Sequence, residues 1–186
     1  MKLDRTALTT IIIILIIIAG AAYYVWFSGA AEDRQMAALP TDNFNKAAQS
    51  INLTNLDDNP VELKDFRGKV LVANSWASWC PFCATELKDF ESLASEYKDR
   101  GVVVLAINRA ESKPQIQAYL NTLSNLDNLV ILQDKEDSYY KFIGGFSMPE
   151  TIFYDTKGNV VFHKRGFMKL EEMRSNIEST LNVGQE

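Results

Sequence analysis

Cysteine and histidine are scarce in this chain of 186 residues, which has two cysteines and one histidine, His163. An exported scaffold held by disulfides carries several widely spaced cysteines, so this protein must depend on its hydrophobic core. A structural zinc site takes four ligands, which two cysteines and one distant histidine do not supply. We therefore expect no disulfide framework, no metal centre and no cofactor.

Basic clusters are also missing from the sequence. The formal net charge is -5, and no run of Lys and Arg residues gathers at one place in the chain. Proteins that bind nucleic acids bring cationic side chains to the phosphate backbone. A nucleic-acid partner is therefore not expected.

Charged residues are absent between residues 6 and 31, and Ile11 to Ile18 contains only isoleucine and leucine. Crossing a bilayer core of about 30 Å takes about 20 helical residues. Four aromatic residues, which favour the membrane interface, follow the apolar run. The predicted organisation is a cytoplasmic N-terminus over 1–5, a transmembrane anchor over 6–27, a linker over 28–50 and a folded domain over 51–186.

The charges that flank this apolar segment predict its orientation. Lys2 and Arg5 precede it, and the excess of positive charge on the cytoplasmic side of membrane proteins then places the bulk of the chain outside the cytoplasm. We expect a single-pass protein of the cell membrane. The alternative is a cleaved signal peptide, for which Ser28-Gly29-Ala30 offers small residues at a cleavage site.

Strand-like and helix-like segments alternate after residue 51. Apolar and β-branched runs predict strands, and apolar residues at helical spacing predict helices. The expected strands cover residues 53–56, 61–63, 70–75, 102–107, 129–132, 151–154 and 160–163. The expected helices follow the cysteines as far as Tyr97, cover 114–126 and 138–142, and carry Leu170 to Leu181. This order predicts one α/β domain with a central mixed sheet flanked by helices.

The two cysteines lie at Trp79-Cys80-Pro81-Phe82-Cys83, where an apolar strand meets an amphipathic helix. Unpaired N–H groups and the dipole at a helix N-terminus stabilise a thiolate, which is the reactive form of cysteine. Pro81 suits the first helical turn because its missing N–H has no partner there. We expect Cys80 to be the exposed attacking thiol and Cys83 the buried thiol that resolves a mixed disulfide.

Other uses of the cysteine pair are open at this point. The pair could form half of a zinc site, an inert disulfide, or a dithiolate that holds Cu(I) for delivery. An inert disulfide across so few residues would stabilise the fold little, because the gain from loop closure grows with loop length. His163 is expected to be a half-exposed strand residue and not a catalyst.

The segment Val70-Leu-Val-Ala-Asn-Ser-Trp-Ala-Ser-Trp-Cys-Pro-Phe-Cys83 resembles the active-site segment of the membrane-anchored TlpA/ResA-like thioredoxin proteins. The resemblance extends over residues 51–182 and includes Phe66-Arg67-Gly68-Lys69 and Met148-Pro149-Glu150-Thr151. It implies a thioredoxin fold that exchanges dithiols and disulfides outside the cytoplasm, often as a reductant in cytochrome c maturation. Its implied partners are protein disulfides and a membrane redox protein that supplies electrons.

The resemblance also assigns individual residues. Pro149 matches the family's cis-proline beside the cysteines, and Met148 departs from the more usual Thr, Val or Ile. Asn74 stands where thioredoxin has a buried acid. Glu86 matches an acidic position of ResA-like proteins and shares a helical stripe with apolar residues, so we expect it to be the proton partner of Cys83.

Two tryptophans complete the expected site. Trp76 and Trp79 are expected to pack around the cysteines and limit access to them. Trp79, Pro81, Met148 and Pro149 are the expected substrate-binding residues, with Asn74 and Trp76 in support. The expected activity is that of a thiol-disulfide oxidoreductase acting as a reductant, and the alternatives are an oxidase that inserts disulfides and a Cu(I) chaperone.

Overall fold

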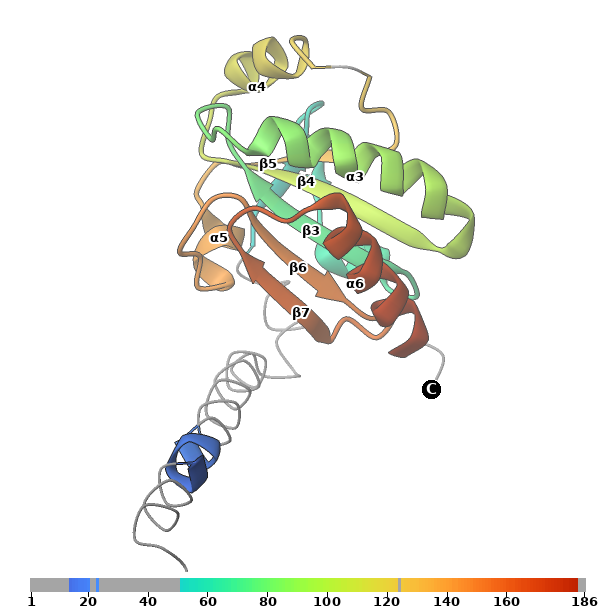
Figure 1. Ribbon diagram of the computed structural model, residues 1–186. Coiled ribbons are helices and arrows are strands. Elements are labelled where there is room, and N and C mark those ends of the chain that lie inside the picture. Colours follow the sequence, from blue (N-terminus) through green and yellow to red (C-terminus); the bar gives the residue numbers. More distant parts are fainter. Residues whose placement is uncertain (1–13, 21–22, 24–50, 124, 184–186) are drawn as a thin grey trace, which may run out of the picture. The chain divides into compact units, whose positions relative to one another are not determined.

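The computed structural model describes residues 14–20, 23, 51–123 and 125–183 (Figure 1). The chain divides into two units, Met1–Ala38 and Leu39–Glu186. In the first unit residues 14–20 are helical. No helix within the described ranges is long and apolar enough to cross a membrane. The predicted anchor over 6–27 lies largely outside these ranges and the linker over 28–50 entirely so, and both stay predictions.

The second unit is built on a mixed sheet in the order β2-β1-β5-β4-β3-β6-β7. The central pairings, β3 with β4 and β4 with β5, are parallel. The outer pairings are antiparallel: β3 with β6, β6 with β7, β5 with β1 and β1 with β2. The strands are β1 (Leu53–Asn55), β2 (Pro60–Val61), β3 (Val70–Trp76), β4 (Val102–Arg109), β5 (Val130–Asp134), β6 (Glu150–Tyr154) and β7 (Val160–Arg165). The predicted mixed α/β fold is confirmed.

Strands β3 and β4 lie at the centre because their sequences are apolar on both faces. All of β3 is buried, and its side chains alternate between two hydrophobic clusters: Val70 and Val72 face one side, and Leu71 and Ala73 face the other. A strand covered on both faces reads as a continuous apolar run. The same alternation points Asn74 and Trp76 towards the face that carries Val72.

Helices cover the two faces unequally (Figure 1). The face with Val72 is covered by α3 (Cys83–Tyr97), α4 (Lys113–Leu120) and α6 (Leu170–Val183), whose buried side chains share one cluster. The other face is covered by α5 (Ser138–Phe142) and the 3-10 helix η1 (Leu63–Phe66). A second 3-10 helix, η2 (Lys98–Arg100), follows α3.

Two predicted elements differ from the structure. The strand expected over 61–63 ends at Val61, because Glu62 and Asp65 form a capping box that starts η1. The helix expected over 114–126 ends at Leu120. The Thr122 hydroxyl donates to the Tyr119 carbonyl at 2.7 Å, a local side-chain bond that competes with continued helix.

Candidate active site

The loop from β3 to α3 carries the two cysteines, and it ends in a disulfide. Cys80 and Cys83 are bonded, with their Cα atoms 5.5 Å apart. The Cys80 N–H donates to the Ala77 carbonyl at 3.1 Å and the Cys83 N–H to the Cys80 carbonyl at 3.3 Å. The helix begins at Cys83, so Cys80 and Pro81 lie in the turn before it. The prediction that Pro81 occupies the first helical turn is wrong, because the two turns closed by these bonds precede the helix and include Pro81.

The exposure of Cys80 also differs from the prediction. In the disulfide form Cys80 is 2% exposed and Cys83 is 0% exposed. The turn folds back onto Ala77 and directs both sulfur atoms into the cluster under α3, so the expected exposed thiol is covered. The small accessible part of the pair belongs to Cys80, so Cys80 is the more accessible of the two cysteines, as predicted.

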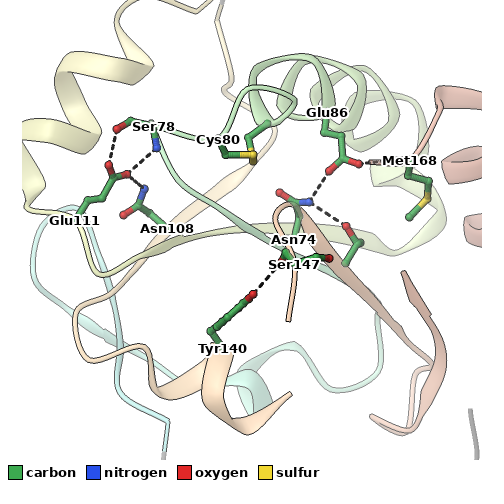
Figure 2. Close-up of a disulfide and its surroundings, with 11 residues drawn as sticks. Asn74, Ser78, Cys80, Glu86, Asn108, Glu111, Tyr140, Ser147 and Met168 are labelled. Atoms are coloured by element: carbon green, nitrogen blue, oxygen red, sulfur yellow. Dashed lines mark hydrogen bonds between the residues drawn. A yellow bond between two sulfur atoms is a disulfide. The ribbon is translucent and has the colours of Figure 1, made fainter. Parts of the chain in front are cut away.

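Glu86 lies one helical turn after Cys83 on the buried side of α3 and is 0% exposed. Residues three apart on a helix have Cβ atoms about 5–6 Å apart. The Glu86 carboxylate accepts a hydrogen bond from Asn74 Nδ2 at 2.9 Å and another from the Met168 N–H at 2.6 Å (Figure 2). Asn74 Nδ2 also donates to Thr151 Oγ1 at 2.9 Å, so one amide group joins α3 to β6.

The environment of Glu86 favours its protonated form. Burial, the largest cause, raises the pKa of Glu86 to about 7. The hydrogen bonds from Met168 and Asn74 act in the opposite direction, and the nearby carboxylates of Asp89 and Glu172 add to the rise. A carboxyl group that titrates near pH 7 is suited to give and take protons at neutral pH. Glu86 and Asn74 are both buried, as the helical stripe of Glu86 and the resemblance at Asn74 predict, whereas the hydrogen bond between them was not predicted.

A second buried carboxylate, Glu111, holds the loop that carries the cysteines. Its Oε2 accepts the Ser78 N–H at 2.8 Å and Asn108 Nδ2 at 2.7 Å, and its Oε1 bonds the Ser78 hydroxyl (Figure 2). Sequence reasoning missed this residue. Ser78 and Glu111 follow the carboxyl ends of two neighbouring parallel strands, β3 and β4, a position that could have marked Glu111.

The loop before β6 contains the predicted cis-proline. The Met148–Pro149 peptide bond is cis, and Pro149 is buried. Glu150 pairs with Ser75 in the register of β6 with β3, so this loop lies at the end of β3 that leads to the cysteines. Glu150 is 0% exposed and was also missed, although a charged residue that opens an apolar strand is a detectable signal.

The two tryptophans of the motif differ in burial. Trp76 is 0% exposed and stacks on Tyr119, with ring centroids 5.6 Å apart, so it packs beside the cysteines as expected. Trp79 is 63% exposed, and the expectation that it packs over the motif is wrong because it sits on the outer side of the turn. His163 is partly buried in β7, as expected, and bonds Glu150.

These groups can carry out dithiol-disulfide exchange. A cysteine pair that closes a disulfide beside a carboxyl group titrating near pH 7 supplies the nucleophile, the resolving thiol and a proton acceptor. Within the described part of the chain, no group of three or more His, Cys, Asp or Glu side chains is placed to hold a metal ion.

Comparisons with known proteins agree with this chemistry. Residues 43–181 match the Redoxin family. The chain is 30% identical over 127 residues to the thiol-disulfide oxidoreductase ResA of Geobacillus kaustophilus, covering 68% of this chain and 72% of that protein. It is 28% identical over 138 residues to the thiol:disulfide interchange protein DsbE of Haemophilus influenzae, covering 73% and 74%.

A solved structure with a similar fold is the exposed lipoprotein thioredoxin of Streptococcus pneumoniae. It superposes with a TM-score of 0.62 at 27% identity, over 70% of this chain and 98% of that one. Residues 43–181, which match the Redoxin family, include the whole described sheet and the cysteine pair. The chain therefore belongs to the redoxin family and is a thiol-disulfide oxidoreductase of the ResA/DsbE type.

Proposed function

We propose that this enzyme reduces disulfide bonds of exported proteins through Cys80 and Cys83, with Glu86 as the proton partner of Cys83. The observation that carries the proposal is the burial of Glu86 one helical turn from Cys83, where its pKa rises to about 7. The proton that leaves Cys83 during exchange then has an acceptor on the same helix face.

The proposed reaction begins with the reduced enzyme. The Cys80 thiolate attacks one sulfur of the substrate disulfide, forms a mixed disulfide and releases the first substrate thiolate, which takes a proton from water. Cys83 then passes its proton to Glu86 and attacks the Cys80 sulfur. This step forms the Cys80–Cys83 bond and releases the second substrate thiolate. Two electrons pass from the enzyme to the substrate, and a membrane redox partner returns them.

Substrate contacts are proposed for the surface around Cys80. Trp79 is exposed at the outer side of the turn, and Met148 precedes the cis-proline at the neighbouring edge. Pro81 is exposed in the turn itself. Trp79 and Pro81 adjoin Cys80 in the chain, and Met148 and Pro149 lie in the loop at the end of β3 that leads to the cysteines, which supports the substrate-binding roles that the resemblance implies.

The reduction potential of the full-length protein tests the direction of electron flow. Equilibration with thiol buffers of known potential, followed by alkylation, gives the fraction of enzyme in the disulfide form. We expect a value nearer to the about -270 mV of thioredoxin than to the about -120 mV of DsbA. A value near the oxidising end would replace the reductase with the alternative, an oxidase that inserts disulfides.

The cellular setting is part of the same proposal. We propose that residues 6–27 anchor the enzyme in the cell membrane and that the catalytic domain faces the extracytoplasmic side, where it acts in cytochrome c maturation. A thiol reagent that does not cross membranes should label the reduced cysteines in intact cells. Mass spectrometry of the mature N-terminus separates an anchor from a cleaved signal peptide. Reduction of an oxidised Cys-x-x-Cys-His peptide tests the substrate class.

A further inference from the structure

We propose that Glu150 is a positioning residue that sets the enzyme's affinity for protein disulfides by holding the loop before Pro149. The inference rests on the proposed function, since it concerns how a protein substrate docks beside Cys80. Glu150 does not touch the cysteines, and its side chain belongs to the other side of the sheet. Along β6, Ile152 packs in the cluster under α5 whereas Phe153 packs in the cluster under α3. Glu150 shares the face of Ile152.

The Glu150 carboxylate joins the loop to the neighbouring strand β7. Its Oε2 accepts the Phe146 N–H at 2.8 Å and the Ser147 N–H at 3.1 Å. Its Oε1 lies 2.6 Å from His163 Nε2 and accepts Arg165 Nε at 3.2 Å. One buried side chain therefore connects two successive loop amides to two side chains of an edge strand.

Other contacts hold the same loop from the side of α5. The Tyr140 hydroxyl donates to the Ser147 carbonyl at 2.9 Å (Figure 2), and the Gly145 N–H donates to the Tyr140 carbonyl at 2.8 Å. A Cβ atom added to Gly145 would lie 2.5 Å from the Tyr140 ring, so the loop packs closely on that ring. Arg165 Nη2 reaches the Gly144 carbonyl at 3.4 Å.

The held segment is exposed and leads directly into the cis-proline. Phe146 is 84% exposed although its N–H is fixed by Glu150, and Met148 and the cis-proline follow directly. An exposed ring on a fixed backbone loses little conformational entropy on binding, so preorganisation raises affinity. Glu150→Gln replaces the charged carboxylate by a neutral amide with a single acceptor oxygen, so the bonds to the two loop amides and to β7 weaken, whereas the cysteines and Glu86 on the other face keep their partners.

The test compares two disulfide substrates with the full-length protein and three variants. Insulin presents a protein disulfide that must dock on the loop, and hydroxyethyl disulfide is too small to do so. Glu150→Gln removes the charge, and His163→Gln removes one partner of Glu150. Lys164→Gln is the matched control: Lys164 neighbours His163 in β7, but its side chain pairs with Glu172 of α6 at 2.6 Å.

We expect Glu150→Gln to raise the KM for insulin about tenfold, the size of one lost hydrogen bond to a charged group. Its kcat and its rate with hydroxyethyl disulfide should stay within about twofold of the wild type. His163→Gln should raise the same KM about threefold, because Arg165 and both amides still bind the carboxylate. Lys164→Gln should match the wild type. Amide hydrogen exchange should show faster exchange at Phe146 and Ser147 in Glu150→Gln than in Lys164→Gln.

Two results would overturn the inference. Equal losses with both substrates would mean that Glu150 acts on the redox chemistry or on the whole fold, and an unchanged KM for insulin would mean that the loop does not set affinity. If Glu150→Gln does not fold, His163→Gln decides the question. A wild-type enzyme that reduces hydroxyethyl disulfide but not insulin would contradict the proposed function. The amide exchange rates at Phe146 and Ser147 would still show whether Glu150 holds the loop.

Discussion

Glu86 and Glu150 are both completely buried and both accept the backbone N–H of a loop beside the cysteines, yet their pKa values move in opposite directions. Burial raises the pKa of Glu86 to about 7, and its two hydrogen-bond donors are neutral. Burial acts in the same direction on Glu150, but the bonds from His163, Phe146 and Ser147 and the charge of His163 outweigh it and hold that pKa below its ordinary value.

The difference shows that burial alone does not decide what a carboxyl group does. A buried carboxyl group whose donors are all neutral accepts a proton near neutral pH, whereas one that also bonds a guanidinium, as Glu150 does with Arg165, stays ionised. The first is suited to proton transfer beside Cys83, and the second to fixing a backbone. The sheet separates them, because Glu86 lies on the α3 side and Glu150 on the face of Ile152.

The strongest way to test the comparison is Glu86→Gln, which removes the group that titrates. We expect the rate of disulfide exchange to fall about a hundredfold, a usual contribution of general acid-base catalysis. The pH dependence near 7 should disappear with it. The matched control is Glu96→Gln, which changes an exposed glutamate on the same helix and should keep the wild-type rate. A pH profile of Glu86→Gln that still bends near 7 would point to another proton partner.

The two glutamates should also affect stability with opposite signs. The pKa of Glu86 rises from an ordinary 4.5 to about 7, so folded protein binds more protons than unfolded protein between these values. Stability then falls as the pH rises through this window, by on the order of 3 kcal/mol. Glu86→Gln should be more stable than the wild type at pH 8, with an advantage that vanishes below about pH 4.

Glu150→Gln should be less stable than the wild type at pH 8, because the lowered pKa of Glu150 stabilises the fold above its ordinary value of 4.5. That contribution disappears as the pH falls through the folded-state pKa. We expect a loss of about 2 kcal/mol at pH 8. Urea unfolding at pH 8 and at pH 4 measures both variants, and changes of the same sign at pH 8 would contradict the comparison.

Asn74→Asp sharpens the comparison by giving Glu86 an ionisable neighbour in place of a neutral donor. Two carboxyl groups at this 2.9 Å contact cannot both ionise freely, so the upper apparent pKa of the pair should rise by about one unit or more above 7. The pH dependence of exchange measures it. An unshifted profile would mean that Asn74 does not face the group that titrates.

His163→Gln gives the smallest expected effect. It removes one donor from Glu150 but leaves Arg165 and the two loop amides, so stability at pH 8 should fall by about 1 kcal/mol, less than in Glu150→Gln. Urea unfolding measures the difference. A loss larger than that of Glu150→Gln would show that His163 stabilises the fold through contacts other than Glu150.

The sequence predicts the central sheet and the cysteine chemistry because both depend on local patterns. The apolar runs of β3 and β4 and the cysteine spacing mark the centre of the fold and the site. The position of Glu86 on a helix stripe indicates its burial, and the resemblance supplies the cis bond at Pro149. In each case residues close together in the chain carry the signal.

The failures concern polar contacts and loop geometry, which the hydrophobic pattern does not report at either short or long separation in the sequence. Nothing near Cys80 shows that its turn folds inward. Glu111 bonds Ser78 across 33 residues, and the partners of Glu150 lie in both a preceding loop and a following strand. The hydrophobic pattern indicates which faces are buried, but it does not indicate which polar groups form hydrogen bonds with one another. For the same reason the exposed position of Trp79 was not predicted.

The bond from Met168 to Glu86 spans 82 residues, and the bond from Asn74 to Thr151 spans 77. During synthesis the cysteines and Glu86 therefore emerge long before the segments that bury them. Non-local contacts of this kind form only after their intervening chain closes. A chain that stops before β6 has both thiols and the carboxyl group, but it lacks Thr151 and Met168, and we expect its Glu86 to be hydrated. The proton chemistry thus appears only with the last fifth of the chain, residues 150–186, which makes the titration of Glu86 a reporter of completed folding.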